Sequence, residues 1–149
     1  MNDPGIPSDP QALADHVGRG MFAEDAASQS LGIQVEAMGP GYARLSMQVR
    51  PDMLNGFKIC HGGFITTLAD SAFAFACNSS NELTLAASIV VEFVASANLA
   101  DVLTAEAKSV ASAGRTGVYD VSVINQRGEL IALLRGRSHR TKDRRVVPA

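Results

Sequence analysis

The sequence has little of what marks several common classes of protein. It contains two cysteines and no tryptophan, and 13 basic residues against 15 acidic ones leave a formal charge of -2. Two cysteines are too few for a disulfide scaffold and fit a reducing compartment. The even charge balance gives no strong field for nucleic acid or for an anionic membrane. We therefore expect a cytoplasmic protein that binds neither.

Motifs for bound metals and nucleotides are also missing. The three histidines, His16, His61 and His139, are scattered, and no Walker loop or G-x-G-x-x-G follows a strand pattern. The first residues have neither the basic start nor the apolar stretch of a secretory signal. The apolar stretch Phe64–Cys77 is too polar and too short for a membrane span of about 20 residues. We expect no metal and no cofactor.

The 149 residues suffice for one domain with its own core. We expect a flexible or helical lead-in over 1–20, one domain over 21–141 and a flexible basic tail over 142–149. From Gln11 to Ser30 the apolar spacing is weakly helical. Gly18 and Gly20 interrupt it and predict a break into two short helices.

The remaining chain predicts strands around a single long helix. Alternation of apolar and polar residues predicts a hairpin, and four later segments are rich in Val, Ile, Leu and Thr. The expected strands are Ile33–Met38, Tyr42–Arg50, Leu85–Phe93, Val102–Val110, Gly117–Asn125 and Glu129–Ser138. A helix of roughly 18 residues from about His61 has no Lys, Arg or Glu and is expected to be mostly buried. This order predicts an α+β domain with one antiparallel sheet, whose edges need another subunit.

Asp70 is the only charge on that helix. A carboxylate in an apolar helix loses hydration, which is costly unless a partner or a function compensates. Asp70 is therefore either hydrogen-bonded to backbone or to Thr66, or it is functional. His61-Gly62-Gly63 opens the same helix, where unpaired N–H groups favour negative charge and glycine permits close approach. A carbonyl oxygen held there would be stabilised as an oxyanion, although simple turn chemistry also explains the glycines.

Other polar residues allow both a structural and a functional interpretation. Asn55 alone suggests an ordinary turn, and His61 alone suggests local bonding at a helix start. Cys60 beside His61 looks like a nucleophile pair, but neighbours in sequence rarely point at one another. Arg115 and Arg137 lie beside strand ends, where they could reach a phosphorylated ligand, whereas Lys142–Arg145 suggest a solvated tail.

Several stretches together resemble one family. Met53-Leu54-Asn55-Gly56, Cys60-His61-Gly62-Gly63 and Leu68-Ala69-Asp70-Ser71-Ala72-Phe73 are similar to the hotdog-fold acyl-CoA thioesterases, closest to the phenylacetic-acid-degradation (PaaI) type. Thr116–Asp120 and Arg135–His139 also resemble that type, and the similarity covers roughly 20–140. The resemblance implies one long helix wrapped by a curved antiparallel sheet. It also implies homodimers that commonly pair into tetramers, with active sites at the dimer interface.

The resemblance also implies roles for individual residues. The thioester carbonyl would sit on the Gly62 N–H, with Gly63 supporting the turn and His61 shaping the helix entrance. Asn55 would help to place the water or the carbonyl. Asp70 of the other protomer would act as general base or as nucleophile.

The rest of the substrate would meet a second group of residues. Thr67 and Ser71 would line the pocket, and Arg115 and Arg137 would meet the coenzyme A phosphates, with backbone at Gly114 and Thr116. An Asp at position 70, where a related branch has Glu, favours the phenylacetyl branch. In contrast, Val94-Ala95-Ser96 stand where many relatives carry Arg-Pro, so we do not expect the ligand contact that those relatives make there.

The sequence thus predicts hydrolysis of (hydroxy)phenylacetyl-CoA-like thioesters to the free acid and coenzyme A. Two other functions compete with it. A hotdog hydratase or dehydratase would act on the acyl chain with His61 and Asp70, although the spacing of Asn55 and Asp70 fits thioesterases better. A non-catalytic acyl-CoA-binding module would leave Asp70 without a purpose.

Overall fold

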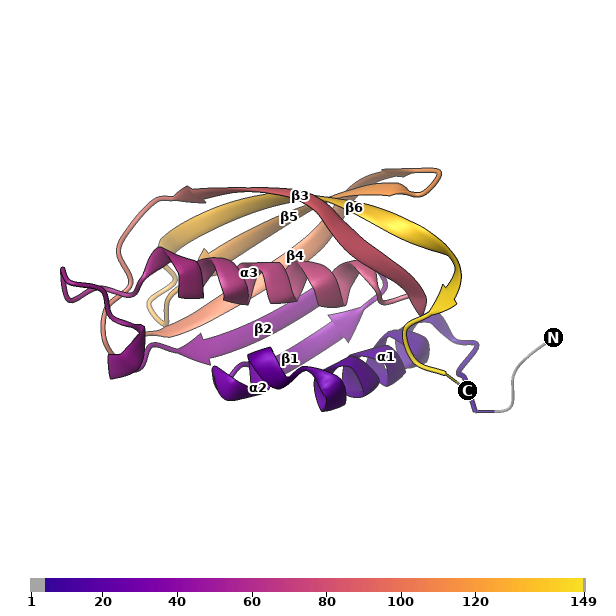
Figure 1. Cartoon of the computed structure of the whole chain (residues 1–149), viewed down its shortest axis with the longest axis horizontal. Helices are drawn as coiled ribbons and strands as arrows, with labels where there is room; N and C mark the ends of the chain where they lie inside the picture. Colours follow the sequence, from indigo (N-terminus) through magenta and orange to yellow (C-terminus); the bar gives the residue numbers. More distant parts are fainter. Residues whose placement is uncertain (1–4, 149) are drawn as a thin grey trace.

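The computed structural model describes residues 5–148 and shows one curved sheet wrapped around one helix (Figure 1). The helices are α1 (Pro10–Glu24), α2 (Ala26–Ser30), the 3-10 turn η1 (Pro51–Met53) and α3 (Gly62–Cys77). The strands are β1 (Gln34–Gly39), β2 (Tyr42–Gln48), β3 (Glu82–Phe93), β4 (Val102–Ala113), β5 (Thr116–Ile124) and β6 (Leu130–Arg145). The α+β class and the hotdog arrangement are confirmed.

The sheet is antiparallel throughout and has the order β1-β2-β4-β5-β6-β3. The helix α3 fills its concave side with side chains that are fully buried, among them Leu68, Phe73 and Phe75. Gly136 of β6 lies under the Phe73 ring, since a Cβ there would come within 2.7 Å of the ring. The core is therefore the space between α3 and the sheet, as the mostly apolar sequence of α3, with Asp70 as its only charge, predicts.

The helix α1 is continuous, so the predicted break at Gly18 and Gly20 is wrong. Asp9 caps its start by accepting from the Ala12 N–H (2.8 Å), and the chain turns only at Asp25. A Cβ on Gly18 would lie 2.7 Å from Met38, and one on Gly20 would lie 2.4 Å from Val147. Both glycines are places where the helix packs closely, and this contact outweighs their poor helix propensity.

The strand β6 is longer than predicted and continues through Lys142–Arg145, which the sequence placed in a flexible tail. Beyond it, Asn81 binds the Val147 backbone twice, accepting from its N–H (2.8 Å) and donating to its carbonyl (3.0 Å). Backbone pairing and this side chain therefore hold a segment whose charge suggested a solvated tail. The expected limits of the domain at 20 and 141 fall inside α1 and β6. Residues 1–4 of the expected lead-in and Ala149 lie outside the described part.

The strand β3 forms one edge of the sheet and pairs only with β6 among the described strands. Large apolar side chains are exposed along it, including Leu85, Val90 and Phe93. An edge of this length with exposed apolar residues is a surface that proteins usually cover. Within residues 5–148, none of the helices is long and apolar enough to cross a membrane.

Candidate active site

The start of α3 is built by three local side-chain hydrogen bonds. His61 is the N-cap, and its Nδ1 accepts from the Gly63 N–H (3.0 Å). The hydroxyls of Thr66 and Thr67 donate to the carbonyls of Gly62 (2.8 Å) and Gly63 (2.9 Å). The Gly62 N–H has no hydrogen-bond acceptor among the described residues. The helix thus presents one free N–H at its positive end.

Asn55 lies in the loop that leads into this helix. Its Oδ1 accepts from the N–H groups of Phe57 (2.9 Å) and Ile59 (3.4 Å), so the turn function suggested by the sequence is present. The loop is closed where the His61 N–H donates to the Met53 carbonyl (2.8 Å). Within residues 5–148, no hydrogen bond engages the Asn55 amide nitrogen, which leaves two N–H donors for a ligand.

A pocket of about 360 Å³ brings Asn55 and Gly62 together. It contains no charged side chain, and most of its lining is apolar. The lining residues are Asn55, Ile59, Cys60, Gly62, Ile65, Phe93, Val94, Ala95, Ser96 and Ala97. A pocket of this composition suits an apolar group whose polar end meets the Asn55 amide and the Gly62 N–H.

Asp70 lies further along α3 and is half-buried. In the described part of the chain it makes no hydrogen bond or ion pair, and the Thr66 hydroxyl is bonded elsewhere. Burial raises the pKa of its carboxyl group. At 1.5 Å per residue, Asp70 is about 12 Å along the helix from Gly62. One small substrate group therefore does not touch both residues of the same chain.

Thr67 and Ser71 flank Asp70 on α3, as the sequence predicts for the helix. The Ser71 hydroxyl lies 3.1 Å from the Ser28 hydroxyl of α2, so α2 packs against the side of α3 that carries Ser71. Cys60 is buried, and desolvation raises the pKa of its thiol to about 11. The thiol is therefore protonated at neutral pH, which disfavours a Cys60–His61 nucleophile pair.

The residues expected to meet phosphates lie at the other end of the sheet. Gly114 and Arg115 form the turn between β4 and β5, which projects at the right in Figure 1, whereas α3 begins at the left. Thr116 pairs with His139, seven residues along β6 from the Ala132 that pairs with Phe93, or about 23 Å. Arg137 is exposed on β6. One chain therefore does not bring Gly114, Arg115, Thr116 and Arg137 to the pocket.

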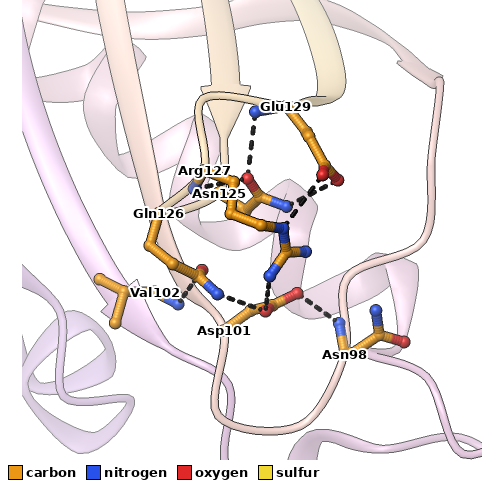
Figure 2. A network of polar contacts seen from close by, with 7 residues as sticks. All are labelled: Asn98, Asp101, Val102, Asn125, Gln126, Arg127 and Glu129. Carbon is orange, nitrogen blue, oxygen red and sulfur yellow. Dashed lines mark hydrogen bonds and ion pairs between the residues drawn. The ribbon is translucent and has the colours of Figure 1, made fainter.

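A polar network that the sequence did not predict fixes the wall of the pocket (Figure 2). Asp101 is buried and accepts from the Asn98 N–H and the Gln126 amide, both at 2.8 Å. The Asn98 bond, first among several causes, lowers the pKa of Asp101. The network ties the 94–101 loop to the β5–β6 turn, and the Ala97 carbonyl in that loop accepts from the Cys60 N–H (2.8 Å). Only the turn at Gln126-Arg127-Gly128 was recognisable from the sequence.

Comparisons with known proteins all indicate the same family. The model of the thioesterase superfamily matches residues 57–132. The acyl-coenzyme A thioesterase PaaI of Escherichia coli (strain K12) is 42% identical over 120 residues, which are 80% of this chain and 86% of that protein. A putative esterase of Archaeoglobus fulgidus is 35% identical over 131 residues, 88% of this chain and 85% of that protein.

Solved structures agree in fold. The E. coli PaaI protein from the phenylacetic acid degradation operon has a TM-score of 0.88 at 38% identity, over 89% of this chain and 96% of that chain. A hypothetical thioesterase protein with coenzyme A from Streptococcus pneumoniae TIGR4 has a TM-score of 0.72 at 25% identity, over 75% and 90% of the two chains.

Fold and family together define a hotdog-fold thioester hydrolase. More particularly, the chain belongs to the thioesterase superfamily and, within it, to the PaaI type. In residues 5–148, no group of three His, Cys, Asp or Glu side chains is arranged to hold a metal ion. The absence of a cofactor and of a metal stays a prediction.

Proposed function

We propose that the protein hydrolyses acyl-CoA thioesters with aromatic acyl groups of the (hydroxy)phenylacetyl kind. The carbonyl oxygen binds the Gly62 N–H beside Asn55, and Asp70 of the partner subunit removes a proton from the attacking water. The negative oxygen that forms is stabilised by the N–H and by the positive end of α3. The intermediate then collapses with cleavage of the C–S bond, and the proton held by Asp70 passes to the departing sulfur, which releases the free acid and the thiol of coenzyme A.

The observation that carries this proposal is the separation of two unpartnered groups on one helix. The Gly62 N–H and the Asp70 carboxylate both lack a partner within the described residues, yet they lie about 12 Å apart along α3. An oxyanion donor and a base must both lie within hydrogen-bond reach of the reacting group. Two chains in opposite orientation supply that pair at each of two equivalent sites.

The free edge of β3 supports such an assembly. If two β3 strands pair antiparallel about a two-fold axis, their sheets join and the unpaired backbone N–H and C=O groups of the edge are satisfied. Strand direction reverses across the axis, so the Leu85 end of one β3 lies beside the Phe93 end of the other. We propose a homodimer of this kind, and a tetramer formed from two dimers.

The reversed strand direction in such a dimer also bears on the phosphate-binding candidates, which lie far from the pocket of their own chain. The turn at Gly114 and Arg115 belongs to the Leu85 end of the sheet, through the pairs Thr116–His139 and Leu85–His139. Arg115 of the partner subunit therefore approaches the pocket of this chain, and Arg137 follows on the neighbouring strand. We propose these two arginines, with the backbone of Gly114 and Thr116, as the ligands of the coenzyme A phosphates.

The acyl-CoA class is supported by the named relatives and by the uncharged pocket. PaaI of E. coli is an acyl-coenzyme A thioesterase from a phenylacetic acid degradation operon, and the S. pneumoniae relative contains coenzyme A. The hydratase alternative is not favoured, because Nδ1 of His61 already accepts the Gly63 N–H at the helix start.

The variant Asp70→Asn tests the mechanism. We expect it to keep the native mass of the wild-type assembly but to lose release of free thiol from phenylacetyl-CoA and hydroxyphenylacetyl-CoA by at least about 100-fold, the usual range for a general base. Asp143→Asn, the same change at an exposed carboxylate outside the site, is the matched control and should retain the wild-type activity. Full activity of Asp70→Asn would overturn the mechanism, and turnover of an enoyl-CoA without thiol release would favour the hydratase.

A further inference from the structure

Phe93 stands directly over the start of α3. A Cβ added to Gly62 would lie 2.9 Å from the Cζ atom of the Phe93 ring, so the ring packs against the glycine backbone. Phe93 is the last residue of β3 and points to the same side of the sheet as Val91, whose partner Leu134 is buried. Its side chain remains 55% exposed. Phe93 and Gly62 both line the pocket, so part of the exposed ring borders it beside the Gly62 N–H.

The pocket around Phe93 distinguishes the acyl end of a substrate from its nucleotide end. Its lining includes no Arg, Lys, Asp or Glu, and its volume of about 360 Å³ is at the small end for a ligand site. Phosphates therefore have no counter-charge there, whereas an acyl group and its thioester carbon fit. Phe93 is the only aromatic side chain in the lining.

We infer that Phe93 is the residue that gives this site a preference for aromatic over aliphatic acyl groups, by direct contact between its ring and that of the substrate. The inference rests on the thioesterase function proposed above and names its specificity residue. Aromatic rings attract one another in edge-to-face and offset arrangements, beyond the area they bury. A leucine in place of Phe93 keeps most of the apolar contact and loses that attraction.

The test compares kcat/KM for phenylacetyl-CoA and butanoyl-CoA in the assembled protein. In Phe93→Leu we expect the ratio of the two values to fall roughly 2- to 10-fold, the usual worth of an aromatic pair, with butanoyl-CoA turnover little changed. Phe93→Tyr should keep the wild-type ratio. The matched control is Phe57→Leu, the same change at an exposed residue of the neighbouring loop that does not line the pocket, which should also keep the ratio.

Binding provides a readout that does not depend on turnover. In an Asp70→Asn background, Phe93→Leu should weaken the binding of phenylacetyl-CoA, measured by calorimetry, by the same factor. The binding of butanoyl-CoA should stay unchanged. An equal loss for both esters, or a lower melting temperature with an unchanged ratio, would make Phe93 a packing residue and overturn the inference. Failure of the wild type to release thiol from any ester would overturn the proposed function instead. The binding ratio would still decide the role of Phe93.

Discussion

Asp70 shows at the scale of one residue how a proposed function can oppose stability. It is half-buried, lacks a hydrogen bond among the described residues, and burial raises its pKa. The folded state therefore binds a proton to this carboxyl more tightly than the unfolded state. Its contribution to stability is fully present below the ordinary carboxyl pKa of about 4 and is lost as pH rises through the raised value. At neutral pH the charged form is a cost to folding.

Asp70→Asn should therefore raise the melting temperature at pH 7, because the amide removes a desolvated charge. The gain should vanish at about pH 3, where an ordinary Asp is also protonated. Calorimetry or circular dichroism at the two pH values measures it. Asp143→Asn is a matched control at an exposed site whose φ of 54° suits Asn as well as Asp, and it should show no such difference. A lower melting temperature at pH 7 for Asp70→Asn would mean that the carboxylate has a partner in the assembly.

At the scale of elements, the contact between α1 and the chain end reverses the usual rule for glycine. Alanine stabilises a helix interior by about 1 kcal/mol relative to glycine. At Gly20, however, the new Cβ would lie 2.4 Å from the Val147 side chain. The backbone of Val147 is held by Asn81, so the clash is not relieved by a free movement of the segment.

We expect Gly20→Ala to destabilise the protein by about 1–3 kcal/mol, the usual cost of overpacking. In a Val147→Ala background the same change should become neutral or stabilising by up to about 1 kcal/mol. Urea denaturation of the four proteins of this cycle measures the coupling. The Cβ added by Gly18→Ala would contact the flexible Met38 side chain instead of Val147. Its effect on the free energy of unfolding should therefore be the same in both backgrounds. A Gly20→Ala effect that does not depend on residue 147 would contradict the packing argument.

The predictable elements are those with a local signal. The mostly apolar sequence of α3 and the alternation in β2 are local signals, and both elements lie near the limits that the sequence predicts. The break expected at Gly18 and Gly20 is wrong, because their packing partners Met38 and Val147 are remote in sequence. The strand end at 142–145 was missed for the same reason, because its partner β3 is distant.

The residues of the candidate site show the same difference between local signals and contacts that are remote in sequence. Asn55 and Gly62 are close in sequence, and both line one pocket. Phe93 ended a correctly expected strand, but its position over Gly62 depends on how β3 lies against α3. The buried role of Asp101 likewise depends on Gln126 and Asn98, so an isolated acid in a loop gave no signal.

At the scale of the whole molecule, the site is expected to be shared between two chains, and subunit mixing tests this. Asn55→Asp keeps the Oδ acceptors of the loop and removes the amide donors, whereas Asp70→Asn removes the base. Each variant alone should be nearly inactive. Dimers refolded from an equal mixture should recover about a quarter of the wild-type activity, because half are mixed and each of these has one intact site.

The control for this experiment is the double variant Asn55→Asp/Asp70→Asn mixed with Asp70→Asn, which yields no intact site and should recover nothing. Thiol release is assayed after the native mass of each mixture is checked. If Asn55 and Asp70 of one chain served the same site, the first mixture would recover nothing either. That result would contradict the shared site while leaving the thioester hydrolase intact.

The place of β3 in the sheet has a consequence for synthesis of the protein. Its only sheet neighbour among the described strands is β6, and both β4 and β5 are made between the two. While a ribosome makes the chain, the apolar β3 therefore waits without a neighbour until nearly every other element has emerged. Long-range pairing of this kind is slow and exposes strand edges in the meantime. The edge proposed to join two finished subunits is thus also the segment that most needs protection in the nascent chain.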